Sequence, residues 1–586
     1  MAARPTQMDD KKSLTDEIRS ELRARQRSAG RNPLTLVLKG RVEDALNDLV
    51  FYTPPKRFGA RFDSVLAGIA AVFGTPPAPT QRDLLSFVAD LSKWLRSFLP
   101  RWNLQNPELN ADAALPKAAL DAMGDQAAAL AVRLARSVPD AEKDLLRMWR
   151  SKTAARFKAE GASHPDQEAD AFVGDTLETF LTNIAQGLGS SRVRKIAQMQ
   201  LDGLTPTRIG NDYAAYLRYA QFVGASFVTC NPPLVNLAWE ANPERWDPVV
   251  DGVIRANPLA DPDRLALWVT LEFVLSNMLL LRPIFLLTLG QTGCVCLQVN
   301  PHKHADSETM IADARAVYAE LRRRLSGGVP NIVFKLPGTL AGLHACRDLT
   351  ADGIGVTITV NFGLFQHLPF AAAIQQGQAI FSTLAHMSGR LAFPVRDELL
   401  SMTGALAAAG IDESMIREAA AWSGIAVLKR LHREMETHGI DRNRVRPLIA
   451  SLRMYAGAGY EALPSPCPDI TEAVGTGVIT VFPNVRRAFD SVPIEALDPR
   501  RIDQPVPERI FKVLQHSQIF KQAYWVPGSS VDPVWRPTKP LTLEDVAGTE
   551  AWLPVSNTLG EFVKAYDTFV DRILARRQGL AEGAPA

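Results

Sequence analysis

The sequence has few cysteines and a small net charge, and each of these features excludes a class of protein. The 586 residues include five cysteines, an odd number, and most of them lie in apolar runs. That usage fits a reducing compartment better than a disulfide framework. The net charge of +2 provides no global attraction to nucleic acid or to an anionic membrane. We therefore expect a cytoplasmic protein that binds neither nucleic acid nor membrane.

Sequence motifs for common cofactors and metals are also missing. No G-x-G-x-x-G or G-x-x-x-x-G-K-[ST] follows an expected strand, which argues against a dinucleotide site and a phosphate-binding loop. Cys294 and Cys296 alternate along an expected strand, but no second pair has ligand spacing. His302 and His304 lack an acidic partner at such a spacing, so we interpret them as part of a solvated loop. We expect no metal site.

The longest apolar run, residues 265–289, is interrupted by Glu272, Asn277, Arg282 and Pro283. These residues favour a buried helix followed by a turn over a membrane span. A helix this apolar has to be covered by a second domain or by another subunit. Assembly into a homo-oligomer therefore stays open as an alternative.

The spacing of apolar residues along the sequence divides the chain into three parts. Residues 1–190 show apolar residues at helical spacing and predict an all-helical accessory domain. Residues 191–495 alternate short β-rich runs with helical ones. Residues 496–586 predict a loop-rich and helical segment that packs on the barrel, with a final helix at 558–577 and a disordered tail, AEGAPA.

The middle part predicts a parallel barrel. Strands that alternate with helices imply βα units and a parallel sheet. Eight such units indicate a (β/α)8 TIM barrel, whereas six would indicate an open doubly wound sheet. The eight runs are IAQMQLD (196–202), SFVTCN (226–231), CVCLQVN (294–300), NIVFKLP (331–337), GVTITVNF (355–362), RLAFPV (390–395), PLIASLR (447–453) and VITVFP (478–483).

Lys335 is the candidate nucleophile. In NIVFKLP it shares a face with Val333, among apolar neighbours and close to the carboxyl end of the strand, where barrel enzymes place their chemistry. Desolvation favours the neutral form of a lysine amine, which can then condense with a carbonyl. The alternative is a lysine that extends outward at the edge of a strand.

Other strands also end in polar residues of one parity, and together they predict a polar mouth around Lys335. Burying such groups without partners would be costly. Ser451 and Arg453 form a hydroxyl–guanidinium pair suited to phosphate, and Arg396 is a second candidate; the alternative for each arginine is a salt bridge at the rim. The groups are Thr229 with Asn231, Cys296 with Gln298 and Asn300, Thr357 with Thr359 and Asn361, and Ser451 with Arg453.

The ordered series of motifs resembles the bacterial transaldolases across residues 195–495. TCNPPLV is similar to their T-[ST]-N-P-x-[IL], and NIVFKLPGTLAG to their K-[VL]-P-x-T-x-x-G. ASLR is similar to their A-S-x-R, and LRPIF begins a stretch like their LRPVY. The first 190 residues show no such resemblance.

The resemblance implies a transaldolase-type barrel and a class I mechanism. Lys335 would form a Schiff base with a sugar phosphate and carry a three-carbon dihydroxyacetone unit, without any cofactor. Asn231 would orient donor hydroxyls, Thr359 would assist, and Ser451 and Arg453 would hold the phosphate. Asp202 fits the family's acid/base carboxylate best, and Asp212 is the alternative.

Three positions depart from the transaldolase pattern. Gln298 stands where the family has a glutamate that positions water, Thr357 where it has an asparagine, and Ala392 where it has a serine. Gln298 and Ala392 resemble the fructose-6-phosphate aldolases, although Pro394 replaces the tyrosine of that subgroup. A plain aldolase and a non-catalytic sugar-phosphate-binding scaffold therefore stay open as alternatives.

Overall fold

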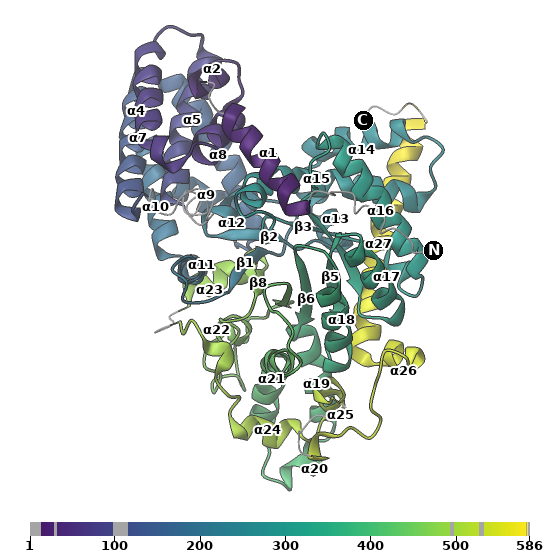
Figure 1. The fold of residues 1–586 in the computed structure, drawn as a ribbon. Coiled ribbons are helices and arrows are strands. Elements are labelled where there is room, and N and C mark those ends of the chain that lie inside the picture. Colours follow the sequence, from purple (N-terminus) through teal and green to yellow (C-terminus); the bar gives the residue numbers. More distant parts are fainter. Residues whose placement is uncertain are drawn as a thin grey trace, which may run out of the picture.

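Eight parallel strands close into a barrel in the computed structural model, which describes residues 13–28, 32–97, 115–492, 497–526, 533–581 and 583. The order of strands around the barrel is their order along the chain, and β1 pairs with β8 to close it (Figure 1). The predicted (β/α)8 TIM barrel is therefore confirmed. Its strands are β1 (Arg208–Asn211), β2 (Ala225–Val228), β3 (Val295–Gln298), β4 (Ile332–Pro337), β5 (Gly355–Asn361), β6 (Ser382–Met387), β7 (Val445–Ala450) and β8 (Val478–Val481).

Two of the eight strands were predicted in the wrong place. Residues 196–202 lie in helix α11 (Arg192–Leu201) and its cap, because Ser191 accepts a hydrogen bond from the Arg194 amide and starts a helix of mostly unbranched residues. Residues 390–395 lie in helix α19 (Ser388–Ser401), whose buried residues follow helical spacing. Ala392 therefore does not lie on the sixth strand.

The true first and sixth strands carry a weak sequence signal. β1 has four residues and includes a glycine, and β6 reads STLAHM, with polar and small residues in place of branched apolar ones. Both are buried on each face by the closed barrel and the surrounding helices, and this tertiary setting outweighs their low β propensity.

The N-terminal part is helical throughout its described residues, as expected. Helix α5 lies at its centre, and its Trp94 ring packs edge-on against Phe222 of the barrel layer with 4.6 Å between centroids. One apolar core therefore continues from the helical part into the barrel. The helices are α1 (Leu14–Ser28), α2 (Pro33–Val37), α3 (Val42–Val50), α4 (Pro55–Val72), α5 (Ala78–Arg96), α7 (Lys117–Ser137), α8 (Pro139–Ala159), α9 (Pro165–Val173) and α10 (Leu177–Ser190).

Helices around the barrel and after it complete the fold. They are α11, α12 (Leu217–Phe222), α13 (Pro232–Ala241), α14 (Pro243–Ala256), α15 (Pro262–Leu287), η3 (Pro301–Lys303), α16 (Ser307–Arg324), α17 (Leu340–Ala351), α18 (Leu364–Gln376), α19, α20 (Thr403–Ala407), α21 (Glu413–Thr437), α22 (Pro468–Thr471), α23 (Pro483–Ser491), η4 (Arg501–Asp503), α24 (Glu508–Leu514), α25 (Gln518–Tyr524), η5 (Pro533–Trp535), α26 (Val546–Ala551) and α27 (Leu553–Ala581).

Helix α15 contains the long apolar run. Its length and composition would suit a membrane span, but 67% of its most apolar 18-residue window is buried inside the structure. Burial of that extent is typical of the core helix of a globular fold. The cover comes partly from α1 and from α27, which both pack against α15.

The C-terminal helix α27 packs on the barrel, in contact with α13, α14, α15, α19 and β5 (Figure 1, yellow). The predicted final helix is confirmed, and it is longer than 558–577 at both ends. The boundary expected at 495 lies outside the described residues, as does most of the tail expected to be disordered.

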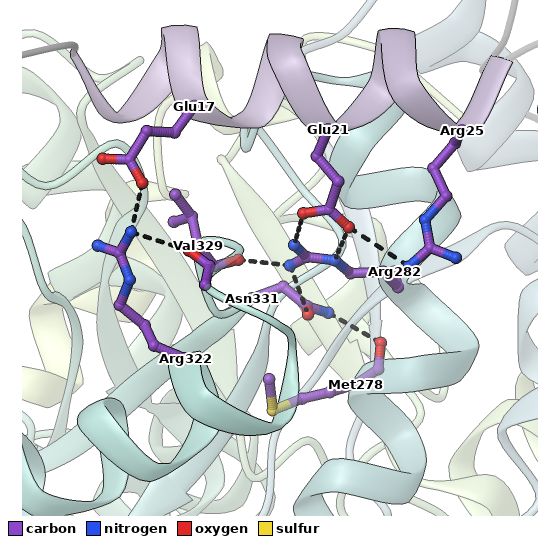
Figure 2. A network of polar contacts seen from close by, with 9 residues as sticks. Glu17, Glu21, Arg25, Met278, Arg282, Arg322, Val329 and Asn331 are labelled. Atoms are coloured by element: carbon purple, nitrogen blue, oxygen red, sulfur yellow. Dashed lines mark hydrogen bonds and ion pairs between the residues drawn. The ribbon is translucent and has the colours of Figure 1, made fainter. Parts of the chain in front are cut away.

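Helix α1 fastens the N-terminal part to the barrel through ion pairs. Figure 2 shows Glu17, Glu21 and Arg25 on the face of α1 that looks toward Arg322 and Arg282. The Arg282 side chain is 4% exposed, and it pairs with Glu21, whose carboxylate also lies 3.6 Å from Arg25.

The same arginine is bound from the barrel side. Arg282 donates to the Val329 carbonyl and to Oδ1 of Asn331, 3.3 Å away. Asn331 is buried and donates to the carbonyls of Met278 and Gly293 at 3.0 and 2.8 Å. A buried guanidinium with this many fixed acceptors holds α1, α15 and β4 in one arrangement.

Replacing Glu21 with glutamine should destabilise the protein by roughly 3 kcal/mol, because Arg282 would keep a buried charge without a counter-ion. Glu17→Gln is the matched control on the same helix. Its partner Arg322 is 36% exposed, so the loss should stay below about 1 kcal/mol. Urea unfolding of both variants measures the difference, and equal losses would contradict the role assigned to Arg282.

Candidate active site

Lys335 lies where the sequence predicts it, on a strand whose six residues are all buried. Its backbone pairs with Gln298 of β3 on one side and with Thr357 of β5 on the other. Because neighbouring residues in register share a face, the three side chains point into the barrel together. The lysine is 5% exposed. The Lys335 amine therefore lies inside the barrel, between the Gln298 amide and the Thr357 hydroxyl.

Asp212 follows β1 directly and reaches the same interior. Its Oδ1 accepts a hydrogen bond of 2.6 Å from Thr229 Oγ1, which lies 2.7 Å from Thr480 Oγ1 of β8. Burial raises the pKa of the Asp212 carboxyl above its usual range, against the opposing charge of Lys335 and the Thr229 hydrogen bond. A carboxylate poised in this way beside an amine can exchange protons with a bound substrate.

The prediction that Asp202 supplies the acid/base carboxylate is wrong in this structure. Asp202 caps the C-terminus of α11, is exposed, and accepts a hydrogen bond of 2.7 Å from Gln198. It precedes β1 and so belongs to the amino-terminal end of the barrel, opposite the mouth. The alternative, Asp212, lies in the interior with Lys335, and the preference for Asp202 follows from placing the first strand at 196–202.

A cavity of about 360 Å³ opens next to the mouth. Asn231 and Gln298 both line it, together with Asn300 and Tyr566. Asn231 uses its side-chain oxygen to cap α13 through the Leu234 amide, at 3.0 Å, which leaves its amide group to donate. Gln298 Oε1 is buried and lacks a hydrogen-bond partner among the described residues. Two amides therefore remain available for a ligand in this cavity.

Thr357 and Thr359 both face the interior, and they differ in what they contact. Thr357 Oγ1 accepts a hydrogen bond of 2.9 Å from Thr383, whereas Thr359 Oγ1 lies 3.6 Å from the Met387 sulfur. Val360 then adopts a left-handed φ of 52° and the register shifts, so Asn361 pairs with His386. The sequence predicts that Asn361 shares a face with Thr357 and Thr359, but the register shift moves it off that face.

Ser451 and Arg453 come directly after β7, as expected. Ser451 adopts a left-handed φ of 58°, and the Arg453 amide donates to Asp469, at 2.9 Å. Asp469 also accepts from Ser388 Oγ at 2.6 Å, and burial raises the pKa of its carboxyl to about 6. Because a Cβ at Gly389 would lie 2.3 Å from the Ser451 carbonyl oxygen, only glycine fits this approach of the β6 and β7 loops.

Arg396 is less well placed for a ligand than its neighbour Arg390. Arg396 is paired with Asp397, at 2.8 Å, and its guanidinium lies over Phe393. Sequence reasoning missed Arg390, whose positive charge, like that of Arg453, opposes the rise in the Asp212 pKa that burial causes. The misplaced sixth strand concealed Arg390, since it follows the true β6 by three residues.

Helix α27 contributes two more residues that the sequence did not suggest. The Phe562 ring is buried, with its centroid 5.8 Å from Lys335 Nζ and 5.5 Å from the Arg390 guanidinium. The neighbouring Glu561 forms an ion pair with Arg390. The Phe562 ring therefore lies next to the amine, and neither Phe562 nor Lys335 lines the adjoining cavity.

His302 and His304 serve to hold the C-terminal helices. His302 Nε2 lies 2.6 Å from Asp567 of α27, and His304 Nε2 lies 3.4 Å from Glu550 of α26. Both pairs lie at the rim beside the mouth. They tie the loop after β3 to the helices that follow the barrel.

Comparison with known proteins agrees with this geometry. A family model described as transaldolase/fructose-6-phosphate aldolase matches residues 201–516, which is more than half of the chain. The chain belongs to this family. The match begins at the end of α11 and includes all eight strands, so the family signal coincides with the barrel.

Individual relatives match shorter stretches. Transaldolase 1 of Streptomyces avermitilis is 27% identical over 219 residues, which are 36% of this chain and 55% of that protein. Transaldolases of Thermobifida fusca and Neisseria meningitidis serogroup C are 35% and 37% identical over 102 and 90 residues. Those stretches cover 17% and 15% of this chain and 26% and 24% of the relatives. The chain thus spans about half or less of the length of these transaldolases.

Proposed function

We propose that this family member is a transaldolase-like enzyme that transfers or cleaves a dihydroxyacetone unit of a sugar phosphate through a Schiff base on Lys335. The observation that carries the proposal is the buried amine at the carboxyl end of β4 with the Asp212 carboxyl in its field. The family membership and the names of the relatives support it. The Lys335 amine itself supplies the electron sink, so the reaction calls for no cofactor.

The chemistry starts when the Lys335 amine adds to the ketose carbonyl. The carbinolamine loses water and leaves a protonated imine. Asp212 then takes the proton of the C4 hydroxyl while the C3–C4 bond breaks. The electron pair of that bond moves into the imine to give an enamine, and an aldehyde leaves. In a transfer, the enamine adds to a second aldehyde and Asp212 returns the proton; in a plain cleavage, the enamine is protonated and hydrolysed.

The remaining side chains would position the substrate. Asn231 would donate to hydroxyls of the donor in the cavity, and Thr229 would hold Asp212 in place. Gln298 would orient the water of imine hydrolysis but cannot accept its proton at neutral pH. Ser451, Arg453 and Arg390 would hold the phosphate, because guanidinium groups bind its oxygens in pairs. The Gln298 amide is the feature that keeps a plain aldolase as the alternative.

The predicted division of the chain also remains a proposal, with one change. We infer an accessory helical unit up to residue 190, a barrel at 191–495 and a C-terminal part that packs on the barrel. Helix α1 belongs in sequence to the first part but contacts α15 of the barrel. The accessory unit therefore starts at α2, and it shares an apolar core with the barrel.

Borohydride reduction in the presence of fructose 6-phosphate or dihydroxyacetone should trap a covalent adduct on Lys335, visible by intact mass and by peptide mapping. Lys335→Met should abolish it. Lys429 is the internal control, because it is also a buried lysine whose pKa burial lowers to about 8, but it pairs with Glu472 away from the mouth. No adduct with either ketose, or one on Lys429 instead, would refute the Schiff-base proposal and leave the sugar-phosphate-binding scaffold.

Asp212→Asn should lower turnover of fructose 6-phosphate by at least about 100-fold, the usual contribution of general acid–base catalysis. The Lys335 adduct should still form with dihydroxyacetone, since that donor has no C3–C4 bond to break. Asp202→Asn is the matched control and should leave turnover unchanged. If the two variants were equally impaired, Asp212 would lose its assigned role.

Glu561→Gln should lower KM for fructose 6-phosphate by about fivefold, because the phosphate no longer competes with a carboxylate for Arg390; a partly exposed ion pair is worth up to about 1 kcal/mol. The adduct yield with unphosphorylated dihydroxyacetone should not change. Equal effects on both donors would show that Glu561 acts by holding α27 rather than by occupying Arg390. Steady-state kinetics with fructose 6-phosphate and the adduct yield with dihydroxyacetone make the distinction.

A further inference from the structure

Two arginines meet at the amino-terminal end of the barrel, opposite the mouth that holds Lys335. Arg208 is the first residue of β1 and Arg446 is the second of β7. Arg208 Nη1 donates to the main-chain carbonyl of Gln291, and Arg446 Nη2 donates to the side-chain Oε1 of the same residue, at 2.5 Å. Both guanidiniums therefore converge on the loop between α15 and β3.

Arg446 points into the barrel. It pairs in register with Thr383, whose hydroxyl bonds Thr357 in the interior layer next to Lys335. Its guanidinium lies 4.7 Å from the centroid of the Phe381 ring. Gly477 makes room for it, because a Cβ there would lie 3.0 Å from Arg446 Cβ. The arginine is 5% exposed, whereas Arg208 is partly exposed and open to solvent.

In the described part of the chain neither guanidinium is bonded to a carboxylate, and the Asp441 charge acts on Arg446 only from beyond ion-pair distance. Among the described residues no carboxylate oxygen lies within ion-pairing distance of either guanidinium, and Nη1 of Arg446 is buried without a hydrogen-bond partner. Burial, and then repulsion from Arg208, lowers the pKa of Arg446 to about 9. Burial lowers the pKa of Arg208 to about 10. Both groups are therefore charged at neutral pH.

A buried guanidinium with an unused donor, next to a second positive charge, is costly unless something neutralises it. Gln291 offers only neutral oxygens. The Glu21 carboxylate at the same end is bound to Arg282. What the site lacks is a compact anion that accepts from several N–H groups at once.

We propose that Arg208 and Arg446 bind a tetrahedral oxyanion of the phosphate class at the amino-terminal end of the barrel. Two planar guanidiniums offer paired donors that match the oxygens of such an ion. Four residues along β1 separate Arg208 from Asp212, roughly 13 Å, so this site is distinct from the one assigned to Ser451 and Arg453. The bound ion would join β1, β7 and the Gln291 loop.

The test uses the full chain carrying Arg390→Gln and Arg453→Gln, so that phosphate at the mouth does not contribute. Inorganic phosphate at constant ionic strength should raise the Tm of this protein and give heat in a calorimetric titration. Adding Arg446→Met should weaken phosphate binding at least tenfold. Arg444→Met is the matched control, because Arg444 is an exposed neighbour that bonds the Gly377 carbonyl, and it should leave binding unchanged.

The stability of Arg446→Met without phosphate distinguishes an anion-binding role of Arg446 from a structural one. If the anion site is real, Arg446→Met in chloride should have an unchanged or higher Tm, because a buried charge without a counter-ion has been removed. A lower Tm in chloride with unaltered phosphate affinity would overturn the proposal and make the guanidinium structural. Arg208→Gln, at a partly exposed position, repeats the affinity test if Arg446→Met does not fold.

A phosphate monoester distinguishes the source of the anion. Glycerol 3-phosphate should bind as well as inorganic phosphate if the site takes the phosphate group of a metabolite. Binding of inorganic phosphate alone would assign the site to the free ion. Binding of neither would refute the site.

Discussion

The pairing of β1 with β8 is the constraint on which the candidate site depends. It closes the barrel and so places Asp212 and Thr229, from the start of the sheet, against Thr480 from its end and Lys335 from its middle. In an open sheet the first and last strands would lie far apart, and the short hydrogen bonds among Asp212, Thr229 and Thr480 could not form. The chemistry proposed for Lys335 thus depends on a backbone contact between segments some 270 residues apart in the chain.

The barrel and its interior lysine could be predicted from the sequence, because β4 is a long, apolar strand with one amine on its inner face. The first and sixth strands could not. RIGN and STLAHM carry too few branched residues to indicate strands, and closure of the sheet decides their conformation. These two strands decide which polar residues follow them at the mouth: Asp212, and not Asp202, follows β1, and Arg390 follows β6.

Other features of the site depend on contacts that no local pattern records. Phe562 reaches Lys335 from a helix more than 200 residues later, and an apolar residue on an amphipathic helix does not indicate which face of the protein it covers. The close approach of Gly389 to Ser451 likewise depends on two segments together, the one after β6 and the one after β7. The motifs that resemble those of transaldolases lie on or directly after β2, β4 and β7, and ordered motifs fix the register of strands that periodicity leaves uncertain.

The helices α1 and α27 come from opposite sides of the barrel in the sequence and cover opposite ends of it. One holds a buried guanidinium under the strands, and the other lays an aromatic ring over the amine. A barrel cut out at the limits of the family match would keep its strands and lose both covers. The apolar core is therefore larger than the part of the chain that matches the family, and α27, which lies outside the match, supplies the ring next to Lys335.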